Sequence, residues 1–209
     1  MRLLVTGFEP FAGSPVNPSQ QLAQALAEEP PPGLHTHALI LPVDGAAAPG
    51  MIVGAIESQQ PDLVIMMGQA TGRAVISLER VAINLLDYAI PDNTGAVLVD
   101  QPVVAGGPAA YFATLPLCAM LDAMRQAGVP GELSLSAGAY LCNQVLYAAL
   151  HCIACRGLSA RAGFVHLPAL PEQVPAGSTR TPSMSLATMQ TGVRAAIAAA
   201  ARQPRSQDI

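Results

Sequence analysis

A thiol, an imidazole and a carboxylate stand in this sequence where they could carry out nucleophilic chemistry. Cys142 follows the apolar run 132–137 and Gly138, at the start of a helical pattern. His166 lies near the end of another apolar run, RAGFVH, and Glu79 lies in an otherwise apolar extended stretch. A cysteine nucleophile needs a general base, and the base needs a group that orients its ring. Since a helix amino end also stabilises a thiolate, these residues predict a Cys–His–Glu catalytic set.

Each of the three residues also has a purely structural interpretation. Most free cysteines are small buried hydrophobes, which would explain Cys142 equally well. His166 could be a core histidine with satisfied hydrogen bonds, and Glu79 could pair with an arginine and do nothing else. Arg80 is not the expected partner, because neighbouring residues on a strand point to opposite faces.

The remaining cysteines and histidines are weaker candidates. Cys118 lies on an apolar helical pattern and is expected in the core. Cys152 and Cys155 form a C-x-x-C, which suits a redox pair or half a metal site. Redox motifs of this kind begin a helix, whereas this one ends a helix, and no second ligand pair is evident, so no metal is expected. His35 and His37 share one face of a strand and are expected at a solvated edge.

Buried strand patterns alternate with helical patterns along the chain, with short connections between them. This alternation predicts an α/β fold, a three-layer α/β/α sandwich with a mostly parallel central sheet. A single domain is expected over residues 1–209, with a frayed tail at about 204–209. The expected strands are 2–7, 34–43, 62–69, 132–137 and 161–168, with an extended stretch at 76–93. The expected helices are 19–29, 45–61, 108–128, 140–157 and 184–203.

The composition excludes several classes of protein. Hydrophobic residues make up 51% of the 209 residues and charged residues 11%, which is typical of a chain with a packed core and not of a disordered one. The net charge is −4 and no basic cluster is dense, so nucleic acid is not an expected partner. No apolar run is long enough to span a membrane, and no secretion signal opens the chain. A cytoplasmic protein with reduced thiols is the expectation.

Ligands of open α/β sheets bind outside the carboxyl ends of the strands. Two loops have this position in addition to Cys142 and His166. The loop after the first strand carries Phe8, Phe11 and Asn17, and the loop after 62–69 carries Gln69 and Arg73. These loops are therefore expected to line the site. The second loop, GQATGR, could suggest phosphate binding, but it lacks a full G-x-G-x-x-G, and the chain contains no lysine.

Six sequence blocks, in order, resemble the pyroglutamyl peptidase type I family of cysteine peptidases. They are VTGFEPFAGSPVNPS, GQATGR, LERVAINLLD, IPDNTG, SAGAYLCN and AGFVHLPALPEQ. The blocks span residues 3–173, most of the chain. The resemblance implies an exopeptidase that removes amino-terminal pyroglutamyl (5-oxoproline) residues from peptides through an acyl-enzyme.

The resemblance also assigns roles to individual residues. It implies Cys142 as nucleophile, His166 as general base and acid, and Glu79 as the orienting carboxylate. The family's ring-holding aromatics fall on Phe8 and Phe11, and its amide contacts fall on Asn17 and Gln69. A homotetramer with no metal or organic cofactor is implied as well.

One position departs from the family pattern. The family commonly has D-A-R-I-P-D-N, and its arginine helps to hold the developing oxyanion, whereas this chain has Ala89 at that place. Arg73 is a candidate replacement donor. Two alternatives follow: a catalytically impaired or non-catalytic binder of pyroglutamyl peptides, and a nucleotide- or phosphate-binding α/β protein in which Cys142 is structural.

Overall fold

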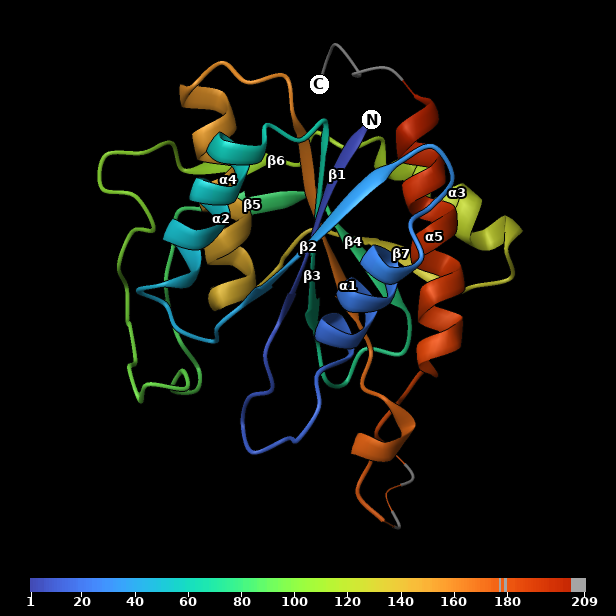
Figure 1. Ribbon diagram of the computed structural model, residues 1–209. Coiled ribbons are helices and arrows are strands. Elements are labelled where there is room, and N and C mark those ends of the chain that lie inside the picture. The colour runs from blue at the N-terminus through green and yellow to red at the C-terminus, as the bar shows by residue number, and fades with distance from the viewer. Residues whose placement is uncertain (177, 179, 204–209) are drawn as a thin grey trace.

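Buried apolar runs of the sequence form a six-stranded sheet in the computed structural model (Figure 1), which describes residues 1–176, 178 and 180–203. The tail expected at 204–209 lies outside this part. The sheet has the order β2-β1-β3-β8-β4-β7. Its strands are β1 (Arg2–Phe8), β2 (His35–Leu41), β3 (Leu63–Gln69), β4 (Ile76–Glu79), β7 (Gly131–Ser134) and β8 (Arg161–Leu167). All neighbours are parallel except β4 and β8, so the expected mostly parallel α/β sheet is confirmed.

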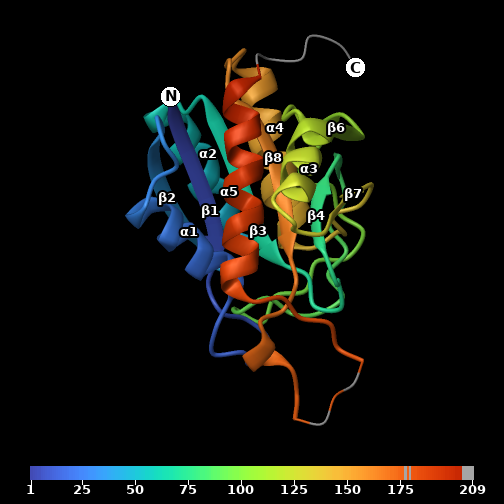
Figure 2. The same cartoon turned by 90° about the vertical axis from the view of Figure 1, so that its right-hand side faces the viewer.

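Helices cover both faces of the sheet, which completes the three-layer sandwich (Figures 1 and 2). Helices α2 (Ala48–Gln59) and α4 (Leu141–Cys155) pack on one face. Helices α1 (Pro18–Glu28), α3 (Leu117–Gln126) and α5 (Leu186–Arg202) pack on the other. A 3-10 turn, η1 (Pro171–Gln173), follows β8. A separate two-stranded sheet joins β5 (Val81–Ile83) to β6 (Ala110–Phe112).

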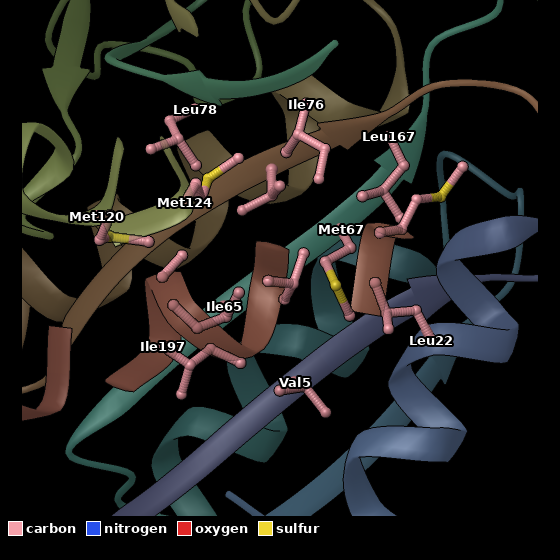
Figure 3. Packing of buried hydrophobic residues seen from close by; sticks show 14 of the residues in the cluster. Val5, Leu22, Ile65, Met67, Ile76, Leu78, Met120, Met124, Leu167 and Ile197 are labelled. Atoms are coloured by element: carbon pink, nitrogen blue, oxygen red, sulfur yellow. The ribbon is translucent and has the colours of Figure 1, made fainter. Parts of the chain in front are cut away.

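Alternating side chains of the central strands fill the two cores. The odd-numbered residues of β1 and β3 face α1, α3 and α5, while the even-numbered ones face α2 and α4. Continuous apolar runs such as LVIMM are therefore buried on both sides, as parallel strands require. Figure 3 shows the core under α1, α3 and α5, with Val5, Leu22, Ile65, Met67, Ile76, Leu78, Met120, Met124, Leu167 and Ile197 labelled.

The helix expected over 108–128 is wrong in its first half. Residues 110–112 form β6, and the helix begins only at Leu117. Pro116 restricts the residue before it to extended conformations, so the helical pattern cannot extend back through it. Cys118, expected in the core, is exposed in the first turn of α3.

Two other stretches are less regular than the sequence suggests. The strand expected over 132–137 ends at Ser134, and Leu135 is 72% exposed. The extended stretch 76–93 contributes only β4 and β5 before it becomes irregular. His35 and His37 are both exposed on the edge strand β2, as expected. Among the described residues, no helix is long and apolar enough to cross a membrane.

Candidate active site

The register of three strands places Gly68, His166 and Glu79 on the face of the sheet that α4 covers. Gly68 of β3 lies opposite His166 of β8, and these residues continue the rows of Met66 and Phe164, whose side chains pack under α4. Glu79 of β4 lies opposite Phe164. Directly paired residues project to the same face, so the three positions share one surface.

Glu79 orients the ring of His166. The carboxylate Oε1 lies 2.7 Å from Nδ1 of the imidazole, and both side chains are buried. Because β4 runs antiparallel to β8, Glu79 pairs with Phe164, two residues before His166, and so lies farther than His166 from the carboxyl end of β8. The contact fixes Nδ1 as the protonated nitrogen when the carboxylate is ionised, which leaves Nε2 as the basic nitrogen.

The same oxygen of Glu79 binds Arg73. Its Nη1 lies 2.7 Å from Oε1, and its Nη2 donates to the carbonyl oxygen of Ser136 at 3.0 Å. The expected ion pair of Glu79 with an arginine therefore exists beside its contact with His166, and Arg73, not Arg80, is the partner. Both terminal nitrogens of Arg73 are engaged by Glu79 and Ser136, and its role as an oxyanion donor stays a prediction.

Cys142 is the second residue of α4, directly after a turn in which Gly138 has a φ of 79°. An alanine Cβ at Gly68 would lie only 2.9 Å from Sγ of Cys142, so the sulfur rests on the backbone of β3. Since Gly68 pairs with His166, the thiol lies one strand away from the imidazole on the same face. The thiol therefore lies at the start of a helix that follows a strand, as expected.

The electrostatics of Cys142 differ from the expected thiolate. Burial and the negative charge of Glu79 raise the pKa of the thiol to about 12, against the lowering effects of Arg73 and of its own backbone N–H. Burial also lowers the pKa of His166 below its ordinary value, more than Glu79 raises it. Desolvation outweighs the helix amino end, so the resting pair is a neutral thiol beside a neutral imidazole.

A small pocket opens beside the thiol. It has a volume of about 70 Å³, and its walls include the expected aromatics Phe8 and Phe11. The full lining is Phe8, Phe11, Asn17, Val43, Gln69, Tyr140, Leu141 and Cys142. The structure therefore places all four expected binding residues in one pocket with Cys142. Figure 1 shows the loop after β1 and the first turn of α4 at the same lower end of the molecule.

The two amides in this pocket are already engaged. Asn17 caps α1 by accepting from the backbone N–H of Ser19, and it donates to the carbonyl of Glu9. Gln69 donates to Thr71 and accepts from Gln173. In this structure both amides hold the walls of the pocket in place through these contacts.

Two residues of the site were not recognised as contributors from the sequence. Tyr140 lines the pocket and donates to the carbonyl of Pro91 at 3.1 Å. Gln173, after β8, donates to the carbonyl of Val16 and to Gln69, which joins two walls of the pocket. Residue type carried no signal for them, because each acts through a contact between segments far apart in the chain. The sequence predicts Arg73 near the site as an oxyanion donor but does not predict its contact with Glu79.

Substitution of Gly68 by alanine is expected to lower kcat/KM by about 100-fold. The new Cβ would lie 2.9 Å from both Sγ of Cys142 and Cζ of Phe164, so the nucleophile must move. Overpacking of this kind also costs about 1–3 kcal/mol of stability. Steady-state kinetics and thermal unfolding measure both effects. Gly54→Ala is the control, since no atom lies within 4 Å of its Cβ and activity should not change. Unchanged kinetics of Gly68→Ala would contradict this placement of the thiol.

Other candidate sites do not assemble here. Among the described residues, no group of three or more Cys, His, Asp or Glu side chains could hold a metal ion. A larger cavity of about 470 Å³ lies at the start of α3, lined in part by Arg80, Phe112 and Cys118, on the other side from the thiol. Cys152 is buried and Cys155 is exposed at the end of α4, far along the helix from Cys142.

Known proteins resemble this chain over almost its whole length. A sequence model of the pyroglutamyl peptidase family matches residues 1–203. A pyrrolidone-carboxylate peptidase of Streptomyces coelicolor is 49% identical over 208 residues, covering 100% of this chain and 95% of its own. One of Vibrio vulnificus is 47% identical over 192 residues, covering 92% and 89%.

Solved structures agree in fold. A mutant pyrrolidone carboxyl peptidase from Pyrococcus furiosus superimposes with a TM-score of 0.92 at 39% identity, covering 96% of this chain and 98% of its own. Pyroglutamyl peptidase I of Bacillus amyloliquefaciens has a TM-score of 0.92 at 35% identity, covering 97% of each chain. With the family model, these likenesses confirm the resemblance read from the six sequence blocks. The chain belongs to the pyroglutamyl peptidase family of hydrolases.

Proposed function

We propose that this protein is a cysteine exopeptidase that removes amino-terminal pyroglutamyl residues from peptides through an acyl-enzyme on Cys142. The observation that carries the proposal is the position of Cys142, which lies one strand from the Glu79–His166 pair and forms part of the aromatic pocket. His166 serves as general base and acid, and Glu79 orients it.

The chemistry begins from neutral partners. His166 takes the proton of the Cys142 thiol as sulfur attacks the pyroglutamyl carbonyl, and the resulting imidazolium is stabilised by Glu79. The imidazolium then gives the proton to the departing amine. His166 next takes a proton from water, which attacks the thioester. The C–S bond breaks, pyroglutamate is released, and the imidazolium returns its proton to the sulfur of Cys142. The backbone N–H of Cys142, in the first turn of α4, is a donor for the oxyanion.

The pocket suits an uncharged ring. Pyroglutamate is a neutral lactam, so its recognition requires flat apolar surfaces and a few matched polar groups, with no countercharge. Phe8, Phe11 and Tyr140 supply aromatic surface, while Asn17 and Gln69 bring amides to the same walls. A free amino-terminal residue would carry an ammonium group into this pocket, where none of the described residues that line the wall is negatively charged. Exclusion of that charge favours pyroglutamyl substrates.

A non-catalytic binder of pyroglutamyl peptides is the second candidate, and Ala89 favours it. The methyl side chain of Ala89 is exposed and offers no donor where the family commonly has an arginine. Loss of one oxyanion donor costs about 3–4 kcal/mol at the transition state when nothing replaces it. Such an enzyme would be slow, and a binder would not turn over at all.

The resemblance extends the proposal to the state of the protein in the cell. It supports a homotetramer that acts in the cytoplasm on peptides, with no metal or organic cofactor. Light scattering of the purified protein tests the tetramer.

Hydrolysis of a fluorogenic pyroglutamyl amide tests the function. We expect cleavage of this substrate, no cleavage of the matching prolyl and glutaminyl amides, and loss of activity after iodoacetamide treatment, because the thiol is the nucleophile. Thermal unfolding with pyroglutamate, proline and nucleotides runs in parallel. Stabilisation by pyroglutamate without cleavage would identify the binder, and stabilisation by nucleotides alone would point to the nucleotide-binding alternative.

A further inference from the structure

The loop between β3 and β4 brings the positive charge of Arg73 to the site, and the proposed mechanism assigns this residue no role. Arg73 is 27% exposed in its side chain, yet its guanidinium reaches a fully buried carboxylate. Its two terminal nitrogens bind two different segments: Oε1 of Glu79 on β4, and the carbonyl of Ser136 on the way to α4. One side chain therefore connects the orienting carboxylate to the segment that carries the nucleophile.

We propose that Arg73 is a positioning residue that holds Glu79 aligned under His166 while it fixes the Ser136–Cys142 turn. The inference rests on the proposed function. It assigns Arg73 no contact with substrate, because the pocket beside the thiol is lined by other residues.

Arg73 can act on His166 through Glu79, because both residues bind the same carboxylate oxygen. His166 and Arg73 both bind Oε1 of Glu79 at 2.7 Å, and Oε2 is buried with no hydrogen-bond partner among the described residues. Burial of a carboxylate without a counter-charge is unfavourable, because burial disfavours its charged form. The Arg73 guanidinium compensates that cost and leaves the contact between Glu79 and the imidazole in place. Its charge thereby preserves the acceptor that the imidazole needs during turnover.

Arg73 also shifts the pKa of both reacting groups in one direction. The charged groups that face His166 are Glu79 from β4 and Arg73 from the loop, and the titratable thiol of Cys142 comes from α4. Glu132 of β7 is held by the hydroxyl of Ser77, the strand neighbour of His166. Arg73 lowers the pKa of His166 and also lowers that of Cys142. Its removal should raise both.

The sign of the pH effect follows from this direction. His166 must be neutral to accept the thiol proton, so kcat/KM rises as the pH increases through its pKa. Since Arg73 lowers that pKa, Arg73→Gln should move the acidic limb of the profile to higher pH. We expect kcat to decrease while KM stays within about twofold, because the substrate pocket is lined by other residues.

Arg73→Lys distinguishes the effect of the positive charge from the effect of the contacts with both Glu79 and Ser136. A lysine keeps the positive charge near Glu79, so the acidic limb should stay near that of the parent protein. Its single ammonium lacks the fork that spans Glu79 and Ser136, so kcat should still decrease. Added guanidinium should restore part of the activity of Arg73→Ala.

Arg80→Gln is the matched control. Arg80 follows Glu79 in the sequence, but it lines the cavity at the start of α3, away from the thiol. The same loss of charge at Arg80 should leave the acidic limb and kcat unchanged. Thermal unfolding of all variants identifies any that do not fold, and Arg73→Lys is the less disruptive substitution.

A second readout does not depend on turnover. The rate of Cys142 alkylation by iodoacetamide, followed by mass spectrometry of its peptide, should be several-fold lower at neutral pH in Arg73→Gln than in Arg80→Gln. This comparison tests Arg73 even if the pyroglutamyl amide is not cleaved and the proposed function fails. Coincident acidic limbs and equal alkylation rates for the two variants would overturn the proposal. So would a decrease in kcat with an unmoved limb and unchanged alkylation, which would make Arg73 a substrate contact.

Discussion

Cys142→Ser is expected to reduce kcat about 10⁴-fold or more, while the melting temperature changes by no more than about 2 °C. The proposed mechanism transfers the proton of residue 142 to His166 during attack, and a serine hydroxyl is a far weaker acid and nucleophile than a thiol in this setting. Serine is close to cysteine in shape, and the thiol rests on the space left by Gly68, so packing should be retained. Steady-state hydrolysis of the pyroglutamyl amide and thermal unfolding measure the two quantities.

The other exposed thiols provide the controls for this variant. Cys118 and Cys155 are both exposed and lie outside the pocket. Cys118→Ser and Cys155→Ser should retain activity, and the parent protein's sensitivity to iodoacetamide should be unchanged in both. A Cys142→Ser protein that keeps thiol-sensitive activity would eliminate Cys142 as the nucleophile.

Glu79→Gln is expected to lower kcat by about 10²–10⁴-fold. The amide can present its NH₂ group to Nδ1 and so favour the wrong ring tautomer, and it cannot stabilise the imidazolium that forms during attack. The variant also leaves Arg73 without its carboxylate, which should lower the free energy of unfolding by about 1–3 kcal/mol. Loss of the negative charge removes an effect that raises the pKa of His166, so the acidic limb should move to lower pH.

Glu132→Gln is the matched control for Glu79→Gln. Glu132 accepts from the hydroxyl of Ser77, the residue opposite His166, but it is exposed on the edge strand β7. An amide oxygen can accept the same hydrogen bond, so kcat should stay within about threefold. If Glu79→Gln keeps kcat within threefold as well, Glu79 does not orient the base.

The catalytic candidates could be predicted because their residue types are reactive and their positions are recognisable in the sequence. The cysteine follows a glycine turn, the histidine lies near the end of a strand pattern, and the carboxylate interrupts an apolar run. The contacts of Arg73 and Gln173 could not be predicted, because they depend on side chains reaching other segments of the chain. The protonation of Cys142 could not be predicted either: its helix position favours a thiolate, and only the folded chain shows how strongly burial opposes it.

The layers of the fold follow from the alternation of apolar strands and amphipathic helices, but strand direction and short elements do not. Nothing local indicates that β4 runs antiparallel to β8, since register is set by the pairing of the whole sheet. The aromatic pair at 111–112 fits a helix pattern and a strand equally well, and its pairing with β5 decides for the strand. Tertiary contacts, not propensity, settle such segments.

The insertion of β8 at the centre of the sheet has a consequence for how the protein is made. Residues 161–167 leave the ribosome after all other strands, yet they separate β3 from β4 in the finished sheet. Until then, β2-β1-β3 and β4-β7 cannot join, and each presents an unpaired inner edge, the kind of surface that aggregates and attracts quality-control proteases. Cys142, the proposed nucleophile, is synthesised earlier, but it lacks His166, its proposed base, until β8 arrives. A chain interrupted before residue 161 thus carries the thiol without the imidazole, and by the proposed mechanism it would not cleave peptides.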